Sequence, residues 1–203
     1  MIQKHTIRDL ISKINWEPFF VEWKFHRRFA SIANVEGCDV VRADWLSDFA
    51  EKDRSKASEA MQLLKEAYRM LELLDKDYSI TTLHGTTQAL PASLQELVAI
   101  GPTHKPYTLM IAIADEEVDL LFEKDEHKRQ MVTTLTNRLV EAAITTTREQ
   151  IAEHKQSFGI DPQSKTPELW KQIDEVLDFK QIGVQITEGG SLTPLSAQCA
   201  IVM

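Results

Sequence analysis

The chain has 203 residues, of which 43% are hydrophobic and 27% charged, and its formal net charge at pH 7 is −8. This size predicts one domain over residues 1–203, and the acidic balance argues against nucleic-acid binding, which needs a basic face. The sequence lacks a signal peptide and any apolar run near the ~20 residues of a membrane span, so we expect a cytoplasmic protein without membrane contact.

The N-terminal residues predict two short helices. Thr6-x-x-Asp9 is a capping box before apolar residues at helical spacing. A second helix, capped near Asn15 or Trp16, has Pro18 in its first turn and extends toward Phe25. The apolar residues of the first helix are Ile7, Leu10, Ile11 and Ile14, and the aromatic residues of the second are Phe19, Phe20 and Trp23.

The middle of the chain changes from helix to strand. Residues 53–75 predict an amphipathic helix, whereas residues 78–84 are rich in β-branched residues and predict a strand that ends at Gly85. Residues 97–100 suggest another strand. The almost wholly apolar segment 108–114 predicts a central strand covered on both faces.

The C-terminal part contains both helical and strand patterns. A helical region is expected over residues 115–156, broken near 125–127, followed by a loop at 159–165 and a short helix that begins at Thr166-Pro167. Two strands, 184–187 and 197–202, are expected to be joined through Gly189-Gly190. Helices first and then a mixture predict an α+β fold, in which a helical N-terminal half packs on a mostly antiparallel or mixed, twisted sheet.

Four blocks resemble one family in order along the chain. Residues 14–23 read I-N-W-E-P-F-F-V-E-W, which is similar to the I-D-W-x-P-F-F-x-x-W of the activation (reactivation) domain of cobalamin-dependent methionine synthase. The N-R-L-V-E-A within 132–143 resembles that family's A-D-R-L-A-E-A helix. Residues 169–173 and 182–188 resemble its short helix and I/T-G-M-x-L-T-E-S strand, and Pro194 matches a later Pro.

The resemblance implies a function in cobalamin chemistry. In the family, the domain binds S-adenosylmethionine and presents its methyl group to an oxidised corrinoid, cob(II)alamin, which is reduced by one electron and remethylated. The present chain would then be a shortened stand-alone relative that acts in trans on a cobalamin-dependent methionine synthase or another corrinoid protein. It would be an accessory subunit with no catalytic residue and no metal ligand of its own.

The departures from the family concern the ligand contacts. The family's Asp is Asn15 here, its R-x-x-x-G-Y motif is replaced by I-D-P-Q-S-K at residues 160–165, and the aromatic-rich last strand is replaced by residues 200–203. A bidentate Arg–carboxylate contact is strong and directional. Its loss predicts weak or absent binding of S-adenosylmethionine to the isolated chain. The alternative function is therefore a non-catalytic binding module of the same fold.

The ligand-binding candidates carried over from the family are Asn15, Trp16, Phe19, Thr187 and Glu188. Asn15 is equally well explained as a helix N-cap, and the aromatic residues as core, with Trp16 the one expected to be partly exposed. Glu188 beside two glycines could face a ligand or be a solvent-facing carboxylate. Because their family counterparts flank one cleft, Asn15 and Glu188 are expected on the same concave face.

Overall fold

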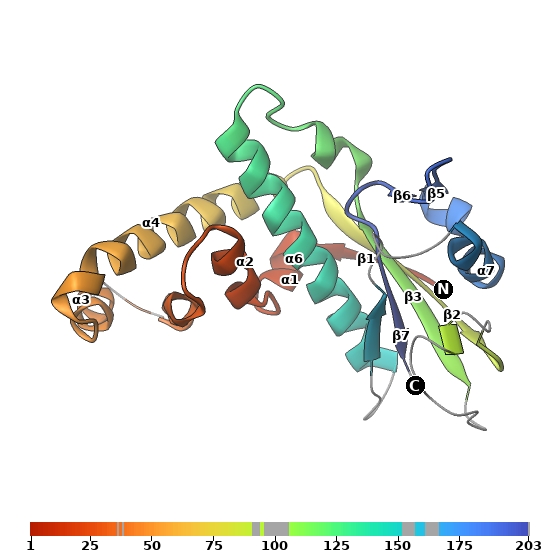
Figure 1. Ribbon diagram of the computed structural model, residues 1–203, viewed down its shortest axis with the longest axis horizontal. Coiled ribbons are helices and arrows are strands. Elements are labelled where there is room, and N and C mark those ends of the chain that lie inside the picture. The colour runs from red at the N-terminus through yellow and green to blue at the C-terminus, as the bar shows by residue number, and fades with distance from the viewer. Residues whose placement is uncertain are drawn as a thin grey trace.

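The fold is built around a five-stranded sheet (Figure 1). The computed structural model describes residues 1–35, 37, 39–90, 94–95, 106–151, 157–160 and 167–202. The strand order of the five-stranded sheet is β1-β2-β3-β7-β4, and every neighbouring pair is antiparallel. The strands are β1 (Ile2–Thr6), β2 (Ser79–Thr87), β3 (Tyr107–Ala114), β4 (Ser157–Ile160) and β7 (Gln198–Val202).

The central strand is β3, as the apolar run predicted, and all of its residues are buried. Its side chains alternate between the two faces, as a strand requires. Ala112 and Ala114 pack into a core shared with the N-terminal helices, whereas Leu109 and Ile111 pack into a second core on the other face. The strand therefore belongs to both cores.

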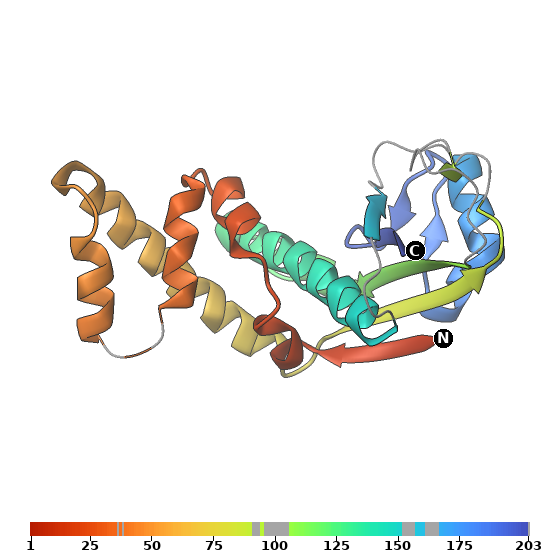
Figure 2. The same cartoon turned by 90° about the horizontal axis from the view of Figure 1, so that it is seen from below.

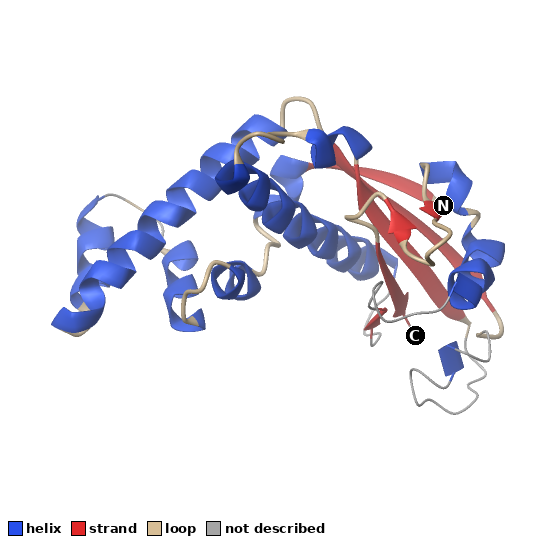
Figure 3. Ribbon diagram, turned by 45° about the horizontal axis from the view of Figure 1, so that its top comes forward, coloured by secondary structure: helices blue, strands red, loops and turns tan. Residues whose placement is uncertain are grey.

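Helices cover both faces of the sheet (Figure 3). One face carries α1 (Ile7–Ile11) and the long α6 (Glu126–Ile151), and the other carries α7 (Pro167–Leu177). The remaining helices are α2 (Trp16–Glu22), the 3-10 helix η1 (Arg27–Asn34), α3 (Asp39–Ser47), α4 (Glu51–Leu74), η2 (Glu116–Leu120) and η4 (Phe179–Ile182). These elements make the expected α+β fold, with the helical N-terminal part packed on a mostly antiparallel sheet.

The helical part extends away from the sheet (Figure 2). Helix α4 reaches from the start of β2 to α3, which lies at the far end of the molecule. The face of α4 predicted to be apolar is buried, since Ala60, Leu64, Ala67, Leu71 and Leu74 are all at most 6% exposed. None of the helices that the structure describes has the length and apolar character of a membrane span.

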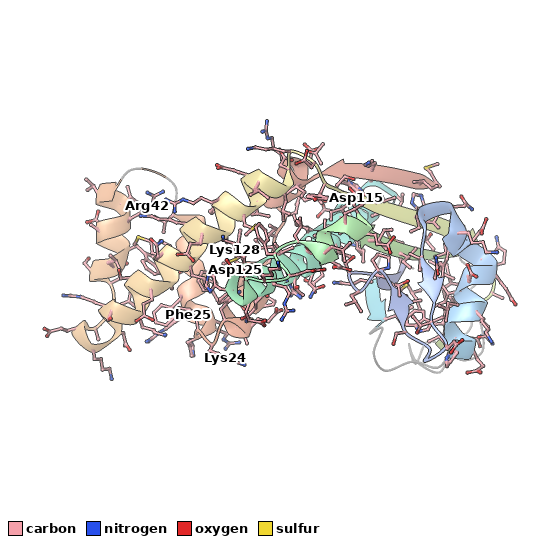
Figure 4. All side chains as sticks on the ribbon, turned by 90° about the horizontal axis from the view of Figure 1, so that it is seen from above. Lys24, Phe25, Arg42, Asp115, Asp125 and Lys128 are labelled. Carbon is pink, nitrogen blue, oxygen red and sulfur yellow. The ribbon has the colours of Figure 1, made fainter. Side chains whose placement is uncertain are left out.

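Local signals set the ends of several elements. Thr6 caps α1 by accepting a hydrogen bond at Oγ1 from the backbone N–H of Asp9, so the predicted N-cap is confirmed. The Thr6 hydroxyl in turn donates to the Asp9 carboxylate. Asp115, just after β3, accepts hydrogen bonds from the backbone N–H (2.8 Å) and hydroxyl (2.9 Å) of Ser79 and fastens the end of β3 to the start of β2 (Figure 4). Lys24 adopts a left-handed conformation (φ 62°) after the end of α2. Phe25 therefore lies outside the helix that was expected to continue toward it.

Several predicted boundaries were wrong. The strand expected to stop at Gly85 continues to Thr87, because Gly85, Thr86 and Thr87 all pair with β3. Gly85 does not end the strand; it lies against α7, where a Cβ would meet Leu177 Cδ2 at 3.1 Å. Gly189 and Gly190 connect two other short strands, which form a separate hairpin, rather than leading to the last strand. These are β5 (Gln185–Ile186) and β6 (Leu192–Thr193).

Other predictions concern residues near the edges of the described ranges. Gly159 and Ile160, expected in a loop, pair with β7 as part of β4. The break in the long helical region is confirmed, since η2 precedes α6 and α6 begins at Glu126. The predicted strand at 97–100, the cap residue Thr166 and the stretch 161–165 lie outside the described residues.

Candidate functional site

The aromatic segment at the start of the chain forms core packing. Phe19 is fully buried and Trp16 is 9% exposed. The Trp16 ring packs edge-on against Phe19, with 5.3 Å between the ring centroids, and in a tilted arrangement against Tyr68 of α4, with 5.4 Å between the centroids. Trp23, at the end of α2, is the half-exposed member of the segment, so the expectation that Trp16 would be the partly exposed aromatic residue was wrong.

Asn15 has a defined structural role. Its carboxamide Oδ1 accepts a hydrogen bond from the backbone N–H of Glu17 at 3.2 Å, which makes it the N-cap of α2. Asn15 and Trp16 also line a hollow of about 390 Å³ beside Arg27 and Arg28 of η1. A polar ligand would meet an exposed Asn15 there.

Thr187 and Glu188 lie in the turn between β5 and β6. Thr187 and Ser191 exchange two hydrogen bonds: the Thr187 N–H donates to the Ser191 carbonyl at 2.8 Å, and the Thr187 Oγ1 accepts from the Ser191 N–H at 3.0 Å. Glu188 is exposed at the tip of this turn. Gly190 has φ 82° and packs against Pro167 at the start of α7, which holds the turn against that helix.

A larger hollow, of about 660 Å³, lies where α6, β4 and β7 meet the β5–β6 hairpin. Its volume falls in the range of pockets that hold small ligands. Ser191 and Leu192 come from the hairpin and Cys199 from β7, whose buried thiol has its pKa raised by burial. The other lining residues are Asn137, Arg138, Glu141, Gly159, Ile160, Leu195, Ala197 and Gln198.

The charged side chains that line this hollow, Arg138 and Glu141, come from one turn of α6, and Arg138 also contacts α2. The Arg138 side chain is 11% exposed; its Nη1 lies 3.1 Å from Glu141 Oε2 and its Nη2 lies 3.4 Å from Glu22 Oε1 at the end of α2. The buried Nε of Arg138 has no hydrogen-bond partner among the described residues. Buried polar groups are normally paired, so this N–H is an unsatisfied donor beside the hollow.

Burial and two neighbouring charges shift the pKa of Glu141. Burial raises the pKa of Glu141, the Arg138 guanidinium opposes that rise, and the Glu22 carboxylate adds to it. Gln198 Nε2 donates to the Asn137 carbonyl at 3.2 Å and ties β7 to the same turn of α6. The wall of the hollow is thus fixed by contacts between α2, α6 and β7.

Asn137, Arg138 and Glu141 were not among the sequence candidates. They stand in the block that resembles the family's helix, where only the apolar inner face was interpreted. The available signal was an Arg and a Glu three residues apart, which share a helix face. Nothing in the sequence indicated that Glu22 would join them.

None of the five residues carried over from the family lines the larger hollow. The larger hollow includes two residues of the hairpin that carries Thr187 and Glu188, although neither of those two lines it. Asn15 lines the separate hollow at the start of α2. A shared concave face for Asn15 and Glu188 stays a prediction. Within the described part of the chain, no group of three or more His, Cys, Asp and Glu side chains could hold a metal ion.

Comparisons with known proteins agree with this architecture. Residues 6–100 match the family model described as the vitamin B12 dependent methionine synthase activation domain. The chain also matches the crystal structure of the MetH reactivation domain bound to AdoHcy, with a TM-score of 0.68 and 15% sequence identity over 100% of this chain and 78% of that one. No curated protein matched at the level of sequence. The chain is therefore similar in sequence over residues 6–100 to the methionine synthase activation domain, and it has the fold of that domain along its whole length.

Proposed function

We propose that this protein binds S-adenosylmethionine in the larger hollow and docks on a cobalamin-dependent methionine synthase or a related corrinoid protein. There it assists the reductive remethylation of cob(II)alamin in the cytoplasm. Support comes from the family match over residues 6–100 and from a neighbour of the same fold that holds AdoHcy. The observation that carries the proposal is the hollow between α6 and the C-terminal strands.

The residues of the hollow fit a ligand with an amino-acid end. Arg138 presents a buried N–H without a partner among the described residues, which can donate to a carboxylate, and Glu141 is a half-exposed carboxylate, which can accept from an ammonium group. Carboxamide and hydroxyl groups of Asn137, Gln198 and Ser191 lie around them. S-adenosylmethionine supplies the methyl group, and these side chains bind and orient it.

The hairpin candidates have a supporting role in this proposal. Thr187 fixes the turn that places Ser191 at the hollow, and exposed Glu188 is available to the ligand or to the docked partner. Asn15, Trp16 and Phe19 act mainly through α2, whose last turn presents Glu22 to Arg138. A contact of Asn15 with the ligand would require the ligand to reach the start of α2.

A second function is favoured by the missing Arg of the R-x-x-x-G-Y motif and by the missing aromatic residues of the last strand. Without these side chains, the chain would be a non-catalytic binding module that docks on a corrinoid protein without S-adenosylmethionine. One charge-assisted hydrogen bond is worth roughly 1.5–3 kcal/mol. Its removal moves a micromolar site toward a dissociation constant of about 0.1 mM.

Titration calorimetry of the full chain with S-adenosylmethionine separates the two functions. We expect binding with a dissociation constant of about 0.1 mM and its loss in Arg138→Met. Absence of binding up to millimolar ligand would contradict the first function and support the second. A mixture with a cob(II)alamin-loaded methionine synthase lacking its own activation domain, a one-electron reductant and S-adenosylmethionine should then recover the methylcobalamin absorbance spectrum only when this chain is present.

A further inference from the structure

Two carboxylates flank the guanidinium of the larger hollow: Glu141 lines the hollow, and Glu22 contacts Arg138 without lining it. Among the described residues, Arg138 and Glu141 are the only charged ones that line it, and Glu22 of α2 contacts Arg138 from beside it. The three side chains leave one surplus negative charge. Glu22 and Glu141 are 40% and 42% exposed, whereas Arg138 is 11% exposed.

The Arg138 guanidinium lies next to both carboxylates, with Nη2 facing Glu22 and Nη1 facing Glu141. Its positive charge balances only one of the two negative charges. Each carboxylate also has oxygen lone pairs beyond its one contact with Arg138, and both side chains are half-exposed. A positively charged ligand is therefore favoured over a neutral one of the same shape.

From this arrangement we infer that Glu22 and Glu141 make the hollow select a sulfonium ligand over its thioether product. The inference rests on the proposed binding of S-adenosylmethionine. In the proposed reaction, methyl transfer would break the bond between sulfur and the methyl carbon and form a bond from that carbon to the cobalt of the partner's corrinoid. One-electron reduction of cob(II)alamin would supply the electron pair of the new bond, and the pair of the broken bond stays on sulfur. S-adenosylmethionine thereby loses one positive charge and becomes neutral S-adenosylhomocysteine, for which the surplus carboxylate offers no attraction. Glu22 is thus a specificity-determining residue that strengthens binding of the charged ligand and leaves binding of the thioether product unchanged.

The size of the discrimination follows from partial exposure. The electrostatic attraction between a unit positive charge and a carboxylate several ångströms away at the protein surface is set by an effective dielectric constant of about 20 or more. Dissolved salt weakens this attraction further. This corresponds to roughly tenfold tighter binding of the cation at low ionic strength, and the ratio should shrink as salt is added.

The test uses three ligands and the full chain. S-adenosylmethionine and sinefungin carry a positive charge at or near the sulfur position, and S-adenosylhomocysteine does not. Calorimetry should give about tenfold tighter binding of both cations. Glu22→Gln should reduce the ratio severalfold by weakening the cations while leaving the thioether unchanged. Glu72→Gln on an exposed part of α4 removes the same charge elsewhere and should keep the wild-type ratio.

The outcomes separate this inference from the function it rests on. Failure of all three ligands to bind would overturn the proposed function and the inference with it. Equal binding of cations and thioether by the wild type, or a ratio unaltered in both Glu22→Gln and Glu141→Gln, would overturn the inference alone. A ratio that falls equally in Glu72→Gln would show a general effect of net charge and would likewise overturn it.

Discussion

His5 is a buried titratable side chain between the sheet and α6. It is 5% exposed, and its Nε2 lies 3.2 Å from the hydroxyls of both Thr82 and Thr147, which are 3.1 Å from each other. Burial lowers the pKa of His5, and Asp9 opposes the shift. A neutral imidazole in this position therefore stabilises the fold.

The lowered pKa of His5 predicts acid sensitivity. The folded-state pKa lies below the ordinary value of about 6.5, so the contribution of His5 to stability is present above pH 6.5 and is lost as pH falls through the folded-state pKa. His5→Gln keeps a polar partner but cannot titrate. Urea denaturation at pH 7.5 and 5.5 should show a smaller loss of unfolding free energy in the variant, and an undiminished loss would contradict the assignment.

The cap of α2 gives a second prediction. Asn15→Ala removes the hydrogen bond to the Glu17 N–H and should cost about 1 kcal/mol of unfolding free energy. Asn15→Asp restores the family's residue and keeps an acceptor at the cap. It should therefore unfold at nearly the wild-type midpoint in the same urea titration. Equal midpoints for Asn15→Ala and the wild type would show that this cap contributes nothing.

Residue roles that depend on neighbours in sequence could be predicted, and those that depend on distant contacts could not. The caps at Thr6 and Asn15 involve partners two or three residues away. His5, by contrast, meets residues 77 and 142 positions away. The Glu22–Arg138 contact of the candidate site is of the same long-range kind.

At the scale of elements, the β5–β6 hairpin depends on one glycine. Gly190 has φ 82°, and a Cβ there would lie 2.7 Å from Pro167 Cγ. Gly190→Ala should therefore destabilise the protein by about 1–3 kcal/mol. Gly189→Ala is the matched control, since its Cβ would meet nothing closer than Thr187 Oγ1 at 3.9 Å. Thermal melts of the two variants should differ by several degrees, and equal melting temperatures would refute the argument.

Periodicity predicted the long elements and failed for the short ones. Helix α4 and strand β3 each have one dominant apolar pattern, which fixes their type. Strand β1 was not predicted, because Gln3, Lys4 and His5 leave it without apolar alternation, and pairing with β2 makes it a strand. The larger hollow is built from α6, β4, the hairpin and β7, so its existence depended on the sheet order.

At the scale of the whole molecule, β3 joins the two cores. Trp16, Trp23 and Trp45 lie in or against the helical core, and Trp170 lies in the other. We expect one domain with one cooperative unfolding transition. Two variants test this, one that retains only Trp45 and one that retains only Trp170, with Phe at the other tryptophans. In each variant the unfolding midpoint from tryptophan fluorescence should coincide with the midpoint from circular dichroism. Two separate midpoints, each matching only part of the circular dichroism change, would contradict a single domain.

Strand β7 lies between β3 and β4 although it follows both of them along the chain. During synthesis, β1, β2 and β3 can pair as soon as they emerge, but β4 has its partner only after residues 198–202. The nascent chain must therefore hold Leu109 and Ile111 on an open edge while α6 and α7 are made. Closing such a distant pairing is slow, because the entropy of a long loop is lost first. We therefore expect the interval before β7 arrives to be the stage of synthesis at which the chain is most exposed to aggregation.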